Sequence, residues 1–286
     1  MSQFLTALAD YTRTLPFNVF RFAEIMGDGE PETVDFVATN RCQNVYSVAK
    51  AFTMTAVGIL WDRGQLRLED KICDILSDAL PESGMDDRWR LCTVEMALAH
   101  QVGLPGGFLD IDVLNAAAFG EDYLRYMLTA PLAYTPGEDS IYTDGAYYLL
   151  SRVVERVSGM PLDDFIWREI GLPFGFEELA WSHCPRGYAM GATGLYISAG
   201  DMAKLGALYL GGGQYQGRRV FSEAWRDLAV EKRFSLDPHP TGAYYAKGGM
   251  NGQKLYIIPG QNRVVAMQSY GGNTEVIGDW IAGWRD

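Results

Sequence analysis

Ser47 and Lys50 stand three residues apart in the segment YSVAK, at the head of an apolar run with helical periodicity. Positions i and i+3 of a helix share one face, with Cβ atoms about 5–6 Å apart, so the Lys50 amine can reach the Ser47 hydroxyl. A serine hydroxyl is a poor nucleophile until a neighbouring group takes its proton. The unpaired N–H groups of a first helical turn also favour a developing oxyanion. The pair predicts a nucleophilic serine, although alone it also fits a surface serine and lysine on an amphipathic helix.

A second polar segment, residues 136–145, reads PGEDSIYTDG and leads into a helical pattern. It carries Tyr142 and Asp144, two residues apart. Most of the sixteen tyrosines in the chain are expected in core or turn positions. Tyr142 is therefore a candidate only through the motif around it.

A third segment, residues 245–250, reads YAKGGM and ends a predicted strand. Lys247 is followed there by Gly248 and Gly249. Glycine in a strand often marks a place where another backbone or a ligand approaches closely. The segment therefore predicts that another backbone or a ligand approaches closely beside Lys247.

Other catalytic arrangements are not supported by the residues. The three histidines are His100, His183 and His239, and none lies in a nucleophilic motif. No Gly-x-Ser-x-Gly elbow occurs, which argues against an α/β-hydrolase triad. His100 is expected to be a hydrogen-bonded structural residue before a turn. Asp110 and Asp112 lack the remaining spacing of a calcium loop, so we interpret them as a solvated loop and expect no metal and no cofactor.

Composition limits the partners. The chain has 286 residues, 48% of them hydrophobic, a formal net charge of −12 and a pI of about 4.7. This charge disfavours nucleic acids and anionic membranes. The first residues lack the pattern of a signal peptide, no apolar stretch approaches the roughly 18 residues of a membrane helix, and the four cysteines lack paired spacing. A cytoplasmic protein acting on a small molecule or peptide is expected, with no prediction of oligomeric state.

The remaining patterns predict an α+β fold: an antiparallel sheet flanked by helices, with a mostly helical lobe inserted. Expected domains are a sheet lobe from 1–68 and 187–286 and a helical lobe from 69–186. Strands are expected at 17–25, 33–38, 243–247, 255–258 and 264–269. Helices are expected at 2–13, 47–62, from 93, and at 121–128, 146–157, 199–210, 222–231 and 274–284.

With these segments in order, the chain resembles the superfamily of serine β-lactamases and penicillin-binding proteins, most of all its class C β-lactamase and esterase branch. Ser-x-x-Lys, a tyrosine motif in a loop and a lysine motif on a strand follow one another as in that superfamily. The resemblance extends over nearly the whole chain. It includes LAHQVGLP at 98–105, YTPG at 134–137, LLSRVVERVSG at 149–159 and GLYISAGDM at 194–202.

The resemblance implies a role for each motif residue. Ser47 would be the acylated nucleophile, with Lys50 taking its proton or holding the proton network. Tyr142 would serve as general base, and which residue is the base stays open. Lys247 would keep the proton affinity of the tyrosine low and attract an anionic substrate group. The backbone N–H groups of Ser47 and Met250 would form the oxyanion hole, next to Gly248 and Gly249.

Two departures from the family pattern matter chemically. Asp144 stands where the family usually has asparagine. A carboxylate near Lys50 and Lys247 would favour their charged forms and weaken Lys50 as a base. It also removes an amide donor for a substrate carbonyl. The third motif lacks the threonine that helps to hold a β-lactam carboxylate. Both changes predict weak or no β-lactamase activity.

Two functions remain from the sequence. The first is a serine hydrolase of the β-lactamase and D-alanyl-D-alanine carboxypeptidase type, acting through a Ser47 acyl-enzyme on a small ester, amide or peptide. The second is a catalytically silent ligand-binding or scaffold protein that has kept the cleft, which Asp144 and the missing threonine would permit. Covalent labelling of Ser47 separates them.

Overall fold

The computed structural model describes residues 1–285. They form two compact units. Unit 1 consists of Met1–Ala51, Glu169–Ala180 and Leu195–Asp286, and unit 2 of Phe52–Arg168 and Trp181–Gly194. The domain boundaries near 68 and 187 remain a prediction, because a compact unit is not by itself a part of the chain that folds alone.

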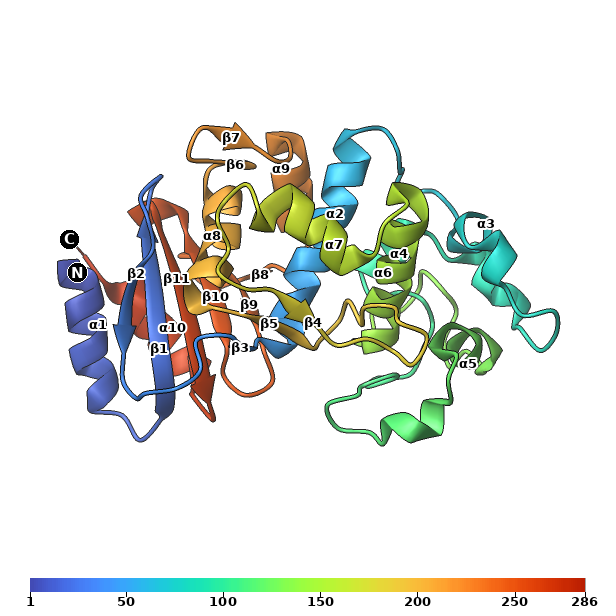
Figure 1. Cartoon of the computed structure of the whole chain (residues 1–286), viewed down its shortest axis with the longest axis horizontal. Helices are drawn as coiled ribbons and strands as arrows, with labels where there is room; N and C mark the ends of the chain where they lie inside the picture. The colour runs from blue at the N-terminus through green and yellow to red at the C-terminus, as the bar shows by residue number, and fades with distance from the viewer. Residues whose placement is uncertain (286) are drawn as a thin grey trace. The chain divides into compact units, whose positions relative to one another are not determined.

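Unit 1 is built on a six-stranded antiparallel sheet with the order β2-β1-β11-β10-β9-β8. Its strands are β1 (Asn18–Met26), β2 (Glu32–Asp35), β8 (Asp237–Pro238), β9 (Tyr245–Gly248), β10 (Lys254–Ile258) and β11 (Arg263–Tyr270). Figure 1 shows β1, in blue, beside β11, in red. The two ends of the chain therefore build one sheet, as the sequence predicts.

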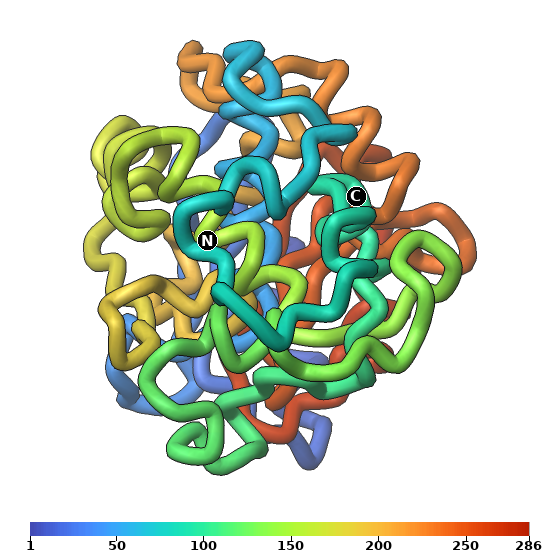
Figure 2. Tube along the Cα trace, turned by 90° about the vertical axis from the view of Figure 1, so that its right-hand side faces the viewer, coloured from blue at the N-terminus to red at the C-terminus, as the bar shows by residue number. Residues whose placement is uncertain are grey.

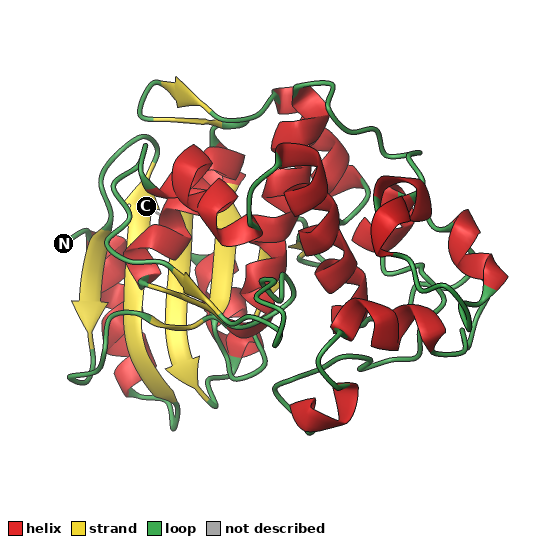
Figure 3. Cartoon of the chain, turned by 45° about the vertical axis from the view of Figure 1, so that its right-hand side comes forward, coloured by secondary structure: helices red, strands yellow, loops and turns green. Residues whose placement is uncertain are grey.

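Helices cover both faces of this sheet (Figure 3). One face packs on α8 (Ala199–Leu210), which contacts β1, β10 and β11. The other packs on α1 (Gln3–Arg13) and α10 (Thr274–Gly283). The three-layer arrangement confirms the predicted α+β fold.

The alternation of side chains along the strands explains these two faces. On β11, Val265 belongs to the apolar core shared with α1 and α10. Its neighbour Val264 faces α8, where a Cβ at Gly206 would lie 2.5 Å from a Val264 methyl group. Gly206 therefore allows α8 to lie close to the sheet.

Shorter elements complete unit 1. The strand β3 (Gln43–Asn44) pairs with β5 (Leu195–Ile197), and β6 (Gln214–Tyr215) pairs with β7 (Arg218–Arg219). The other elements are the helix α9 (Glu223–Glu231) and the 3₁₀ turns Tyr46–Val48 and Pro259–Gln261. The short strands were not predicted, because two or three residues carry no readable alternation.

Unit 2 is mainly helical, with long connections that Figure 2 shows in teal and green. Its α-helices are α2 (Ala49–Asp62, starting in unit 1), α3 (Ile72–Ile75), α4 (Val94–Leu98), α5 (Tyr123–Thr129), α6 (Asp144–Ser158) and α7 (Leu162–Ile166). Its 3₁₀ turns are Ser77–Ala79, Asp87–Leu91 and Ala116–Phe119. Two further elements, the π-helical turn Trp167–Gly171 and the strand β4 (Ala180–Trp181), each include residues of both units, because the chain passes from one unit to the other within them. The helix α6 packs on α3, α4 and α7.

The helix boundaries follow local capping signals. Thr143 caps the start of α6, and Gly159 ends it with a left-handed φ of 75°. Gly64 follows α2 with a left-handed φ of 65°. The start of α2 differs from prediction, because the residues around Ser47 form a 3₁₀ turn and the α-helix begins at Ala49. Among residues 1–285, no helix has the length and apolar character needed to cross a membrane.

Candidate active site

Ser47 and Lys50 lie where the chain of unit 1 enters α2. Ser47 is half-buried in the 3₁₀ turn, and Lys50 is fully buried in the first turn of α2. The Lys50 Nζ donates a hydrogen bond of 3.3 Å to the Ser47 Oγ. The predicted contact between the two side chains is therefore confirmed. Its length is typical of catalytic hydrogen bonds that tighten when substrate binds.

The backbone before Ser47 is held in an unusual conformation. Tyr46 has a φ of 49°, in the left-handed region that residues other than glycine seldom adopt. The Tyr46 N–H donates to Asn44 Oδ1 at 2.8 Å, and the Val45 N–H donates to the Leu195 carbonyl at 2.8 Å. Strain of this kind persists where the surroundings fix it, and it is frequent at functional sites. These hydrogen bonds fix the backbone conformation of the turn that carries Ser47.

The strand that carries Lys247 packs against the Ser47 turn. Lys247 is buried, and β9 contacts the turn Tyr46–Val48. A Cβ at Gly249 would lie 2.6 Å from the carbonyl oxygen of Val45. Since real Cβ atoms do not come so close to backbone, position 249 accepts only glycine without a shift. The predicted close approach is thus made by the backbone immediately before the serine.

A tight loop after β9 presents Met250. The Gly249 N–H donates to the Gln253 carbonyl at 2.7 Å, and the Asn251 N–H donates to Gln253 Oε1 at 3.1 Å. Gln253 in turn donates to the Ser269 carbonyl at 2.8 Å. Within residues 1–285 the backbone N–H of Met250 has no acceptor. That donor suits the predicted oxyanion role, which stays a prediction.

Tyr142 belongs to unit 2 and stacks on His100. The ring centroids are 4.5 Å apart, and 48% of Tyr142 is exposed. His100 Nδ1 accepts the Thr143 N–H at 3.3 Å, and its carbonyl accepts the Ile141 N–H at 2.9 Å. An accepting Nδ1 carries no proton, so a neutral ring has its proton on Nε2. The expectation of a hydrogen-bonded structural histidine is confirmed, and the ring also positions the tyrosine.

Asp144 is the first residue of α6 and is buried. Carboxylate oxygens of Asp110, Asp112 and Asp144 lie within 4.8 Å of one another. Asp112 also accepts a short hydrogen bond from the Thr193 hydroxyl, and the Asp110 carboxylate accepts the Asp112 N–H at 3.0 Å. Residues 110–112 lie in a loop, as predicted, but the side chains of Asp110 and Asp112 are half-buried and converge on Asp144 instead of being fully solvated.

Sequence reasoning did not predict that His100 contacts Tyr142 and Thr143, or that Asp110 and Asp112 converge on Asp144. Their contacts join positions more than thirty residues apart, which no local spacing encodes. The left-handed φ of 58° at His100 could not be predicted from the sequence either. The one available signal was the resemblance of residues 98–105 to a family segment.

Each unit contributes distinct chemistry. Unit 1 supplies a hydroxyl in contact with a buried amine, a second buried lysine and a donor N–H. Unit 2 supplies a half-exposed phenol held by an imidazole, and a buried carboxylate. The first set can make and stabilise an acyl ester on Ser47. The second can move a proton or recognise a polar substrate group.

Comparison with known proteins gives the class. The beta-lactamase family model matches residues 37–282. The chain therefore belongs to the beta-lactamase family. This family of serine hydrolases also includes the penicillin-binding proteins.

The chain is similar to one curated protein in sequence and to two solved structures in fold. "Penicillin-binding protein 4*" of Bacillus subtilis is 30% identical over 49% of this chain and 30% of its own length. In fold, the chain is similar to a D-stereospecific amidohydrolase from Streptomyces sp., with a TM-score of 0.70 and 15% identity over 96% of this chain and 97% of that one. It is equally similar to "EstCE1, a hydrolase with promiscuous acyltransferase activity" (TM-score 0.70, 15% identity, covering 99% and 100%).

The chain spans less than two thirds of the length of the first curated relatives it matches, between 30% and 66%. The two structural similarities are below 25% identity and show the fold alone. The activities of these proteins therefore enter only as proposals.

Proposed function

We propose that the protein is a serine hydrolase that works through an acyl-enzyme on Ser47, with a small ester, amide or peptide as substrate. The observation that carries the proposal is the 3.3 Å hydrogen bond between the Lys50 Nζ and the Ser47 Oγ. A buried lysine in contact with a serine on a strained turn is an activated-nucleophile arrangement. Family membership supports the same chemistry.

The proposed reaction has two steps. In the first, the Ser47 Oγ attacks the substrate carbonyl carbon, and its proton passes to Lys50 or Tyr142. The resulting oxyanion accepts hydrogen bonds from the N–H groups of Ser47 and Met250. Collapse of this intermediate expels the alcohol or amine, which takes up the proton. In the second step water attacks the acyl ester by the reverse sequence, and releases the acid and Ser47.

The substrate is proposed to be something other than a β-lactam. Asp144 replaces a neutral amide donor by a carboxylate, and two further carboxylates lie within 4.8 Å of it. An anionic antibiotic docking near Asp144 would meet like charge. Glycine at 248, in place of the threonine of the family motif, removes a hydroxyl that would bind the antibiotic carboxylate.

Steady-state kinetics test the proposal directly. Ser47→Ala is expected to reduce hydrolysis of a p-nitrophenyl ester by at least about 10³-fold, because the nucleophile is removed. Ser83→Ala, at an exposed serine of unit 2, is the matched control and should retain full activity. A panel of p-nitrophenyl esters, D-amino-acid amides and a chromogenic cephalosporin defines the acyl group. Equal turnover by the Ser47→Ala variant would refute the proposal.

The second candidate is a catalytically silent binding protein. It is favoured by one observation, the buried Asp144 among three converging carboxylates, where the family has an amide. A silent protein would bind a ligand without forming a covalent bond. Intact mass spectrometry after exposure to reactive esters and β-lactams separates the two, since only the hydrolase gains an acyl adduct.

A further inference from the structure

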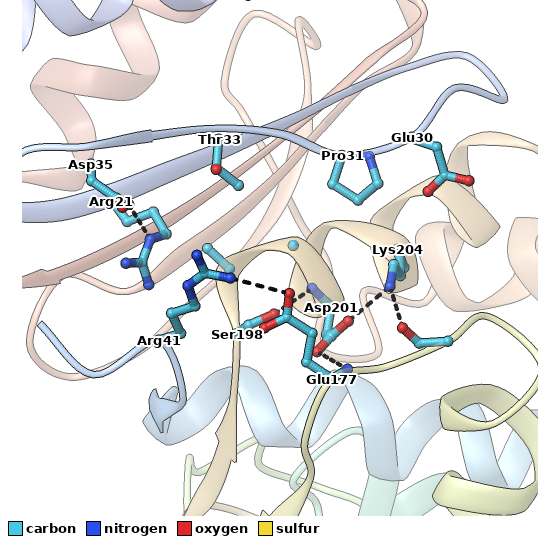
Figure 4. Close-up of a pocket in the computed structure, with 13 residues that line it drawn as sticks. Arg21, Glu30, Pro31, Thr33, Asp35, Arg41, Glu177, Ser198, Asp201 and Lys204 are labelled. Atoms are coloured by element: carbon cyan, nitrogen blue, oxygen red, sulfur yellow. Dashed lines mark hydrogen bonds and ion pairs between the residues drawn. The ribbon is translucent and has the colours of Figure 1, made fainter.

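A cavity of about 280 Å³ lies within unit 1 at the start of α8 (Figure 4). Its lining is largely charged. Dashed lines in Figure 4 join its cations to carboxylates of the same lining: Arg21 to Asp35, Arg41 to Glu177 and Lys204 to Asp201. Because these charges are already paired, we assign the cavity no ligand. A more specific feature lies beside the Ser47 turn.

Two large apolar side chains of unit 1 are exposed there. Met250 is 52% exposed and Tyr270 is 59% exposed. The segments that carry them are hydrogen-bonded to each other, because the Asn251 carbonyl accepts the Gly271 N–H at 2.9 Å and the Ser269 hydroxyl at 3.3 Å. We call these two side chains the Met250–Tyr270 patch. Apolar and aromatic side chains grouped beside a reactive centre are typical of a ligand site.

The alternation of side chains along β11 places Tyr270 on the face of the sheet that carries the serine turn. Met267 belongs to the core shared with α1 and α10. Gln268 therefore faces the other way, and its Nε2 donates to the Ile197 carbonyl of β5 at 2.9 Å. Tyr270, two residues further along, shares the face of Gln268. Since β5 pairs with β3 and anchors the turn before Ser47, the turn lies on this face too.

The acyl-enzyme proposed at Ser47 fixes where an acyl chain begins. Its carbonyl oxygen would accept the Met250 N–H at a normal hydrogen-bond length of about 2.9 Å. The first carbons of the acyl chain therefore start close to the Met250 Cα, whose side chain is exposed. A chain that leaves the ester on this side covers the Met250 thioether and then the Tyr270 ring.

The surroundings of the patch favour an uncharged chain. Residues 248–253 and 268–272 contain no aspartate, glutamate, lysine or arginine. A charged acyl group would lose hydrating water there without gaining an ion pair from these segments. Methionine adapts its shape to flexible apolar ligands, and a tyrosine ring offers a flat apolar surface. The patch therefore suits an aliphatic chain.

We propose that Met250 and Tyr270 bind the acyl chain of the substrate and give the protein a preference for esters of uncharged aliphatic acids. This inference rests on the proposed function at Ser47 and names its substrate class. Full burial of one methylene group favours binding by about fourfold. Hexanoate has four methylene groups more than acetate, so partial burial on the patch is expected to raise kcat/KM by about tenfold.

Kinetics with p-nitrophenyl acetate and p-nitrophenyl hexanoate measure this preference. Tyr270→Ser should lower kcat/KM for the hexanoate by about fivefold and leave the acetate value unchanged, because an acetyl group does not reach the ring. Tyr270→Phe keeps the apolar surface and should keep the preference. Met250→Gln should also reduce the ratio of the hexanoate value to the acetate value. Met26→Gln, the same change at a methionine of β1 that is 41% exposed, is its matched control and should not.

A second measurement does not require turnover. In Ser47→Ala protein labelled with [methyl-¹³C]methionine, titration with hexanoate should shift the Met250 methyl signal in a saturable way, and acetate should not. Equal kcat/KM for the two esters, a preference unchanged in Tyr270→Ser, or no saturable shift of the Met250 signal would overturn the proposal, even where hydrolysis depends on Ser47. Failure of the proposed function is seen separately, as ester turnover that survives Ser47→Ala.

Discussion

At the scale of single residues, two buried lysines lie close to the Ser47 turn. Lys50 contacts the Ser47 hydroxyl from inside the protein, and Lys247 is buried on the neighbouring strand β9. Asp144 in unit 2 is the residue that departs most from the family pattern. It is buried beside Asp110 and Asp112 rather than exposed. The proposed preference against β-lactams rests on this carboxylate.

Replacing Asp144 tests that preference. Asp144→Asn restores an amide donor of nearly the same shape and removes one negative charge from the carboxylate cluster. The rate at which a penicillin acylates Ser47 should rise by about tenfold, the worth of one hydrogen bond to a charged or polarised group. Stopped-flow acylation or time-resolved mass spectrometry measures it. Asp110→Asn serves as control, because it lowers the charge without restoring the amide at position 144. An unchanged or slower rate in Asp144→Asn would show that the carboxylate is not the obstacle.

At the scale of elements, the serine turn is fixed by its neighbours rather than by its own propensity. The Val45 N–H is anchored on β5 through Leu195, and the Val45 carbonyl lies against the end of β9 at Gly249. A change in β9 should therefore move the Ser47 hydroxyl without touching it. Small displacements of a nucleophile are enough to lose much of its reactivity.

Gly249→Ala is the corresponding prediction. The added Cβ would lie 2.6 Å from the Val45 carbonyl oxygen, so the strand end and the serine turn must separate. We expect kcat/KM for the best ester to fall by about 10²-fold, as for a misplacement near 1 Å. Gly260→Ala, where nothing lies within 4 Å of the new Cβ, is the matched control. Equal kinetics of both variants would exclude a role for β9 in positioning the serine.

The elements also show which parts of the structure could be predicted from the sequence. The helix α8 begins and ends where its pattern predicts, at Ala199–Leu210, because Ser198 caps it and glycines follow it. The i, i+3 contact of Ser47 with Lys50 followed from helical geometry alone. The convergence of Asp110 and Asp112 on Asp144 did not, because it depends on how a long loop folds back onto α6. The φ of Tyr46 was also beyond prediction, since tertiary contacts impose it.

At the scale of the whole molecule, burial of tyrosines makes stability depend on alkaline pH. Burial raises the pKa of Tyr215 to about 12, with Glu30 adding to the effect, and burial raises the pKa of Tyr245 to about 12. The unfolded chain ionises these phenols near pH 10, whereas the folded protein keeps them neutral. The unfolded state thus binds fewer protons above pH 10. The stability they contribute is complete below pH 10 and is lost as pH rises toward 12.

The predicted consequence is a loss of unfolding free energy of about 1 kcal/mol per buried tyrosine between pH 10 and pH 11. Tyr215→Phe and Tyr245→Phe should each reduce that loss by this amount. Urea unfolding at the two pH values measures it. Tyr270→Phe, at an exposed tyrosine, is the control and should leave the loss unchanged. A loss as steep in the double phenylalanine variant would contradict the assignment.

The central claim is that Ser47 is the atom that becomes acylated. Incubation with a fluorophosphonate probe, followed by digestion and mass spectrometry of the peptide that contains residue 47, tests it most directly. The account predicts one adduct per chain, on Ser47, absent from Ser47→Ala and retained in Ser83→Ala. Ester hydrolysis with no adduct on Ser47, or an adduct on another serine, would contradict it.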